Sequence, residues 1–156
     1  MNRVFSVLCL CLCAALASIS AGAWEARIFR GNSSYTSDVI YTFDGKHLYR
    51  GNSTCFSDIV YTWDGRHIYT GNSTYSSDIV YTWDGTYLYK GNSTYSADII
   101  MTYDGRYIYN GRSTYSSDIM FTVTVRYVYR AMSTYTSDIL FRLDGKIPLP
   151  VLFTVL

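Results

Sequence analysis

The sequence predicts an all-β fold built from six tandem 20-residue β-hairpin repeats. The first observation is a strict period of 20 residues, which is typical of repeat proteins. The second is an aspartate that occurs in every repeat, and the third is an Asp-Gly pair flanked by β-prone residues. The period is marked by Gly31-Asn32-Ser33, Gly51-Asn52-Ser53, Gly71-Asn72-Ser73, Gly91-Asn92-Ser93, and the weaker Gly111-Arg112-Ser113 and Ala131-Met132-Ser133.

Two aspartate columns occupy fixed positions in the repeat. The first has no exception and is expected to cap amides of the polar linker between hairpins; it comprises Asp38, Asp58, Asp78, Asp98, Asp118 and Asp138. The second column is followed by a glycine expected at the hairpin turn: Gly45, Gly65, Gly85, Gly105 and Gly145. The fifth repeat breaks this second column with Thr124-Val125.

Each repeat is expected to form one hairpin, because Asp-Gly between β-prone runs is a strong hairpin signal. Residues 58–69 illustrate the pattern with DIVYTWDGRHIY. A two-residue loop would pair Tyr61 with Ile68, Val60 with Tyr69 and Thr62 with His67. A three-residue loop with a glycine bulge would shift this register, and the pattern does not choose between them.

The two ends of the repeat region look complementary. Residues 26–30 resemble the second strand of a hairpin, and residues 139–143 resemble a first strand. Pairing of these half-hairpins would remove two open sheet edges. The sequence therefore favours a closed, pseudo-symmetric ring of flower or propeller type. An open β-hairpin solenoid is the alternative.

Residues 1–23 have the layout of a secretory signal peptide, and residues 24–156 form a single repeat domain. Arg3 precedes an apolar run, and Ala21-Gly22-Ala23 supplies a small-residue cleavage pattern. The protein is therefore expected to be exported, to a periplasmic or extracellular location. Removal of this leader would leave Cys55 as the single cysteine, in a column otherwise occupied by tyrosine.

Residues 147–156 form an apolar C-terminal tail, IPLPVLFTVL, that is too short to span a bilayer as a helix. No transmembrane span is expected in the mature chain. The tail is expected to pack into the apolar interior or under the ring, against Val123 and Val125. Thr124-Val125 is expected to cost stability, since neither residue suits a positive φ.

The repeat unit at residues 61–80, YTWDGRHIYTGNSTYSSDIV, together with the leader and the apolar tail, resembles the five-fold β-flower proteins, a group of small exported bacterial proteins. The resemblance covers nearly all of the mature chain. It implies short hairpins arranged around a pseudo-symmetry axis, and it implies no activity. Six Ser-Asp columns fit five-fold symmetry only if the end strands do not form an equivalent sixth petal.

Composition and motifs argue against several classes of function. Loss of Arg3 leaves 12 basic and 12 acidic residues, so nucleic-acid binding has no electrostatic footprint. No phosphate loop, dinucleotide motif or zinc-like ligand spacing occurs, and no cofactor is expected. Ser and Asp recur six times, whereas a catalytic centre needs single, distinct groups. An enzyme is therefore not expected.

The remaining hypothesis is a non-catalytic structural or binding module. The chain holds 17 tyrosines, and aromatic rings beside Asp, Asn and Ser suit stacking on sugars, so a glycan or a protein is the expected ligand. The alternative is a pure structural scaffold or assembly subunit in which the aromatics form the core. The candidate ligand-contacting residues are Trp63, Trp83, His47, His67, Tyr87 and Tyr107.

Overall fold

The computed structural model describes residues 25–156, so the predicted leader lies outside the described residues. Within them, short strands alternate with 3₁₀ turns, and one short helix follows. The strands are β1 (Ala26–Arg30), β2 (Val39–Phe43), β3 (His47–Arg50), β4 (Ile59–Trp63), β5 (His67–Thr70), β6 (Ile79–Trp83), β7 (Tyr87–Lys90), β8 (Ile99–Tyr103), β9 (Tyr107–Asn110), β10 (Ile119–Val123), β11 (Tyr127–Arg130) and β12 (Ile139–Asp144).

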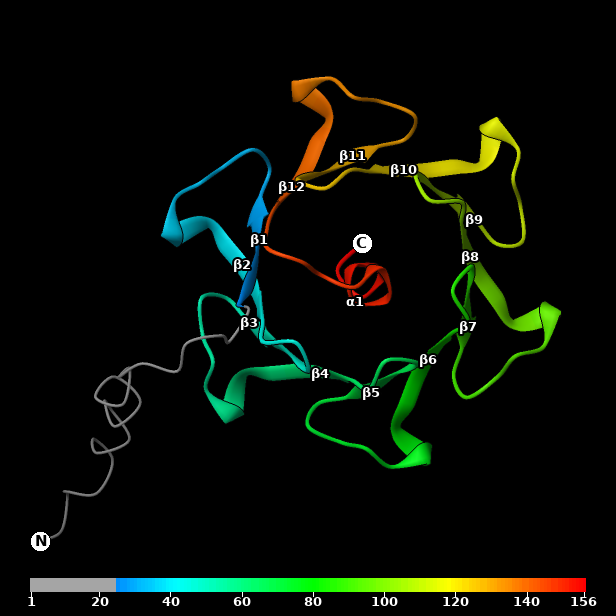
Figure 1. Cartoon of the computed structure of the whole chain (residues 1–156), viewed down its shortest axis with the longest axis horizontal. Helices are drawn as coiled ribbons and strands as arrows, with labels where there is room; N and C mark the ends of the chain where they lie inside the picture. The colour runs from blue at the N-terminus through cyan, green and yellow to red at the C-terminus, as the bar shows by residue number, and fades with distance from the viewer. Residues whose placement is uncertain (1–24) are drawn as a thin grey trace, which may run out of the picture.

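The strands form one closed antiparallel barrel in which every strand pairs with its neighbours along the chain. β1 completes the ring by pairing with β12, where Ile28 lies opposite Leu143. The prediction of a closed ring is confirmed, and the open solenoid is excluded. The two end strands make a sixth hairpin, so five-fold symmetry is corrected to six petals around one axis (Figure 1).

The hairpin register differs from the two-residue Asp-Gly loop considered from the sequence. In the second repeat Thr62 lies opposite Tyr69, and Trp63 lies opposite Ile68. The turn is shifted because Asp64 forms its first corner: the Asp64 carboxylate accepts hydrogen bonds from the Arg66 and His67 amides. Gly65 then follows with a φ of +102°, a value that glycine adopts without strain.

The apolar tail forms the short helix α1 (Leu149–Phe153), which lies inside the ring (Figure 1). Each of three α1 residues packs against a different part of the barrel wall. Val151 packs with Phe43 and Leu48, Leu152 with Ile28, Val128 and Leu143, and Phe153 with Leu88 and Ile108. Because these residues are all buried, α1 fills the ring as a plug and supplies the core that short hairpins lack.

Each hairpin is followed by a petal loop. In five of the six hairpins a buried threonine of the first strand donates its hydroxyl to a carbonyl at the start of the loop, as Thr62 does to Gly71 at 2.7 Å. Each loop then passes through a 3₁₀ turn. These turns are η1 (Thr36–Asp38), η2 (Phe56–Asp58), η3 (Ser76–Asp78), η4 (Ser96–Asp98), η5 (Ser116–Asp118) and η6 (Thr136–Asp138).

Two departures in the late repeats have different consequences. Val125 does not adopt the positive φ of the turn glycines, so the expected strain at this turn is absent. Thr124 replaces the aspartate by bonding both the amide and the carbonyl of Tyr127. Ala131, by contrast, occupies a petal-loop glycine position with a φ of +51°, which is strained for a residue with a Cβ. The backbone strain therefore lies at Ala131 instead.

The closing hairpin has contacts of its own. Arg142 takes the place of the buried threonine, lies 5.1 Å from the centre of the Phe29 ring, and donates a hydrogen bond to the Ser33 carbonyl. A Cβ at Gly145 would lie 2.9 Å from Ala26, so the two chain segments approach closely where the ring closes. These contacts bind the beginning of the repeat region to its end.

Candidate functional site: the exposed aromatic petal tips

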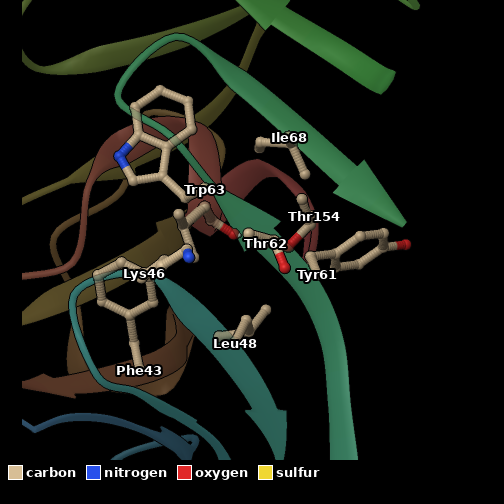
Figure 2. Close-up of a pocket in the computed structure, with 9 residues that line it drawn as sticks. Phe43, Lys46, Leu48, Tyr61, Thr62, Trp63, Ile68 and Thr154 are labelled. Carbon is tan, nitrogen blue, oxygen red and sulfur yellow. Dashed lines mark hydrogen bonds between the residues drawn. The ribbon is translucent and has the colours of Figure 1, made fainter. Parts of the chain in front are cut away.

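The structure places two of the candidate ligand-contacting residues, half-buried, against the core. Trp63 and Trp83 pack against the buried clusters around α1, and the Trp83 ring lies 5.8 Å from that of Phe153. Trp63 and Phe43 of the neighbouring hairpin line the same hollow (Figure 2), which leaves no space for a water molecule. These indoles therefore serve the packing of the plug.

The other candidates, His47, His67, Tyr87 and Tyr107, lie half-buried on the outer side of the barrel wall. Each ring packs against the tyrosine two residues later on the same strand. In the second repeat the Asp64 carboxylate joins this group, because it accepts the Tyr69 hydroxyl at 2.7 Å and lies 3.0 Å from His67 Nδ1.

This arrangement changes the acidity of the turn aspartates. Burial raises the pKa of Asp64, but hydrogen bonds from the His67 amide, the Tyr69 hydroxyl and the Arg66 amide outweigh it and lower that pKa to about 2. The pKa values of the equivalent Asp44, Asp84 and Asp104 are lowered by similar bonds against the same opposing effect of burial. The group acts as a charge-assisted turn clamp.

Stability is therefore expected to fall with pH in the acid range. An aspartate with a depressed pKa in the folded state stabilises the fold above its unfolded pKa, and this stability is lost as the pH falls through the folded pKa. We expect the urea midpoint to decrease between pH 4 and about 2. In Tyr69→Phe the pKa of Asp64 should move up towards its unfolded value, so the loss should be smaller and should be complete at a higher pH. A midpoint that stays constant down to pH 2 would contradict the clamp.

The exposed aromatic residues lie at the petal tips, in the tyrosine column of the linker. Their side chains are about three-quarters exposed, from 74% for Tyr35 to 77% for Tyr95. They pack into no core, although the same residue type recurs in five of the six repeats. The petal-tip residues are Tyr35, Tyr75, Tyr95, Tyr115 and Tyr135, with Phe56 exposed to 74% beside Cys55 in the second petal.

A Ser-Asp pair holds each tip in a defined conformation. In the third petal the Ser73 hydroxyl donates to the Asp78 carboxylate at 2.5 Å and accepts a hydrogen bond from the Tyr75 amide. The Asp78 amide in turn donates to the Tyr75 carbonyl, which closes the 3₁₀ turn. The first aspartate column thus contacts linker amides through serine and not directly, and the same Ser-Asp bond recurs in all six petals.

The tip conformation is consequently set before any ligand arrives. Tyr75 precedes η3 with an extended backbone (φ −81°, ψ 142°), and the other tip residues have nearly the same angles. A loop whose backbone is already ordered loses less conformational freedom on binding. The petals, which carry the exposed tip residues, are arranged around the circumference of the ring (Figure 1).

Residues 25–156 contain no group of three or more His, Cys, Asp or Glu side chains arranged to hold a metal ion. Over the same residues, no helix has the length and apolar character needed to cross a membrane.

Comparison with known families identifies the class of protein. The family described as "6-fold beta flower protein" matches residues 28–152, which span the repeats and reach into α1. The chain therefore belongs to the 6-fold beta flower proteins, in agreement with the six hairpins of the ring. Neither a search of curated proteins nor a search of solved structures found a match.

Proposed function

We propose that the protein is an exported, non-catalytic binding module whose petal tips contact carbohydrate. The observation that supports this proposal most is the exposure of the tip tyrosines, which recur without contributing to the core. Exposed aromatic rings present a flat apolar face, which suits the C–H face of a sugar. The neighbouring Asn, Ser and Thr side chains of the petal loops supply hydrogen-bonding groups for sugar hydroxyls.

The arrangement favours a repeating polymer over a compact ligand. The tips lie on separate petals around the ring (Figure 1). Weak contacts at several equivalent sites combine strongly when one ligand reaches more than one of them. A polysaccharide or a glycan-covered surface has this repetitive character. The absence of distinct catalytic groups among the tips agrees with binding alone.

The tip tyrosines are the direct test of this function. We expect the protein to sediment with at least one polysaccharide in a panel of chitin, cellulose, xylan and mannan. Tyr75→Ala alone should weaken binding modestly, whereas joint replacement of Tyr75, Tyr95 and Tyr115 by Ala should weaken it by a factor on the order of 100 if contacts are multivalent. The thermal midpoint should not change, because these side chains are exposed.

Two matched variants sharpen the result. Replacing the same three tyrosines by Phe should retain most of the stacking and hence most of the binding. Val125→Ala changes an exposed apolar residue outside the tips and should have no effect. Undiminished binding by the triple Ala variant, or failure to bind any polysaccharide, would refute the proposal and favour a scaffold role.

A further inference from the structure

A second candidate site, separate from the petal tips, lies where the hairpin turns surround one mouth of the ring. It is a hollow of about 590 Å³, within the range of small-molecule sites. Turn residues of the first, fourth, fifth and sixth repeats and the segment leading into α1 form its walls. The principal lining residues are Phe43, Tyr103, Val123, Leu143, Leu149 and Lys146.

The lining is mostly apolar and carries one positive charge. Aromatic and aliphatic side chains from opposite parts of the ring face the hollow above Leu152 of the plug. Lys146 is the one charged residue among those lining it, and it forms no ion pair within the described residues. An exposed cation at the edge of an apolar hollow is the arrangement that complements an anionic head on an apolar chain.

The fifth repeat, which lacks the Asp-Gly pair, contributes its turn to this hollow. Where four other turns place Asp-Gly followed by a strand, this turn places Thr124-Val125, and both residues line the hollow. The substitution removes a carboxylate and adds an apolar side chain that is 91% exposed. The other hairpins form with Asp-Gly at this position, and Val125 does not adopt the positive φ of those glycines. The hairpin turn itself therefore does not require Thr124-Val125. The change makes the hollow more apolar and less negative.

Two carboxylates near the hollow, those of Asp44 and Asp144, differ in how far they oppose the positive charge of Lys146. The Asp44 carboxylate, next to lining residue Gly45, accepts the amides of Lys46 and His47 and the Tyr49 hydroxyl. It is therefore engaged by its own turn. Asp144, two residues before Lys146, is exposed and stays available as a competing charge. Removal of the Asp144 charge should therefore strengthen the attraction of the hollow for an anion.

We propose that this turn-side hollow binds an amphiphilic anion, with the aliphatic chain above the plug and the anionic head at the Lys146 ammonium. A free fatty carboxylate and an anionic membrane lipid share this chemistry. The site is independent of the petal tips, so its failure would leave carbohydrate binding untouched.

The test is calorimetric titration of the mature chain with hexanoate, octanoate and decanoate below their micelle-forming concentrations. We expect one molecule bound per chain, with affinity that rises by up to about fourfold for each methylene buried. Lys146→Glu should weaken decanoate binding at least about tenfold, since a charge-assisted contact becomes repulsive. Thr124→Asp/Val125→Gly should also weaken it, and Asp144→Asn should strengthen it.

Controls separate this site from general adsorption. Arg66→Gln removes a cation at the equivalent turn position of the second repeat, outside the hollow, and should leave the affinity unchanged. Decylamine should bind more weakly than decanoate. Flotation with phosphatidylglycerol vesicles, against phosphatidylcholine vesicles, distinguishes the source: binding to the former that is abolished by Lys146→Glu assigns the ligand to the membrane. No chain-length dependence, equal binding of decylamine, or an unaffected Lys146→Glu would overturn the proposal.

Discussion

Deletion of residues 147–156 is expected to destroy most of the stability of the protein. Val151, Leu152 and Phe153 each complete a different part of the wall, so their loss empties the centre of the ring. Truncating one buried Leu or Phe to Ala costs about 2–5 kcal/mol. Loss of three such side chains approaches the whole net stability of a typical domain, about 5–15 kcal/mol.

The measurement is thermal and urea unfolding of the truncated and full-length mature chains, with binding of an apolar dye. We expect the truncated chain to show a much lower melting temperature, or no cooperative transition, and increased dye binding. Leu152→Ala should show an intermediate loss. Tyr135→Ala, which changes an exposed petal tip, should melt like the parent chain. An unchanged melting temperature after truncation would show that the tail is not part of the core.

Removal of β1 is expected to have the second large effect. Deleting residues 24–30 leaves β2 and β12 each with one unpaired edge and uncovers Leu143 and Val128, which pack against Ile28. Unpaired strand edges pair readily with other chains. We therefore expect the shortened chain to associate, and light scattering coupled to size-exclusion chromatography should detect dimers or larger species in place of a monomer.

A peptide added in trans tests whether the missing strand is the cause. A peptide of residues 24–33 should restore the monomer by filling the gap between β2 and β12. The same peptide with Ile28→Asp should not, because Ile28 is completely buried and a charge there has no partner. A shortened chain that stays monomeric and melts normally would contradict a role for β1 in closure.

Most of the fold could be predicted from the sequence because each repeat carries the same local signals. The ring closure was indicated by the unmatched strands at residues 26–30 and 139–143. The number of petals was wrong in the five-fold resemblance, and the six Ser-Asp columns gave the better count. The hairpin register could not be chosen, because it depends on Asp64 accepting the amides of Arg66 and His67, a contact that the order of residues alone does not fix.

The packing of the tail inside the ring was expected from its apolar sequence, but its helical form and the exposed petal tips were not predicted. A five-residue helix containing Pro150 has no apolar periodicity to reveal it and depends on the surrounding ring. Trp63 and Trp83 were predicted to contact a ligand because aromatic rings suit stacking on sugars, yet both pack against the clusters around the plug. A better signal was available for Tyr75 and its equivalents: they recur outside the strands, in a polar linker where little apolar surface can be buried.

The central claim is that β1 and β12 close the ring of six petals, and a disulfide tests it most directly. Arg27 and Asp144 are paired across these strands. Such cross-strand Cα atoms lie about 4.5–5.5 Å apart, within disulfide range. In the mature chain carrying Cys55→Ser, we expect Arg27→Cys/Asp144→Cys to form an intramolecular disulfide on mild oxidation, identified by peptide mass spectrometry. Arg27→Cys/Asp104→Cys should not. Failure of residues 27 and 144 to cross-link within one chain would contradict the closed ring.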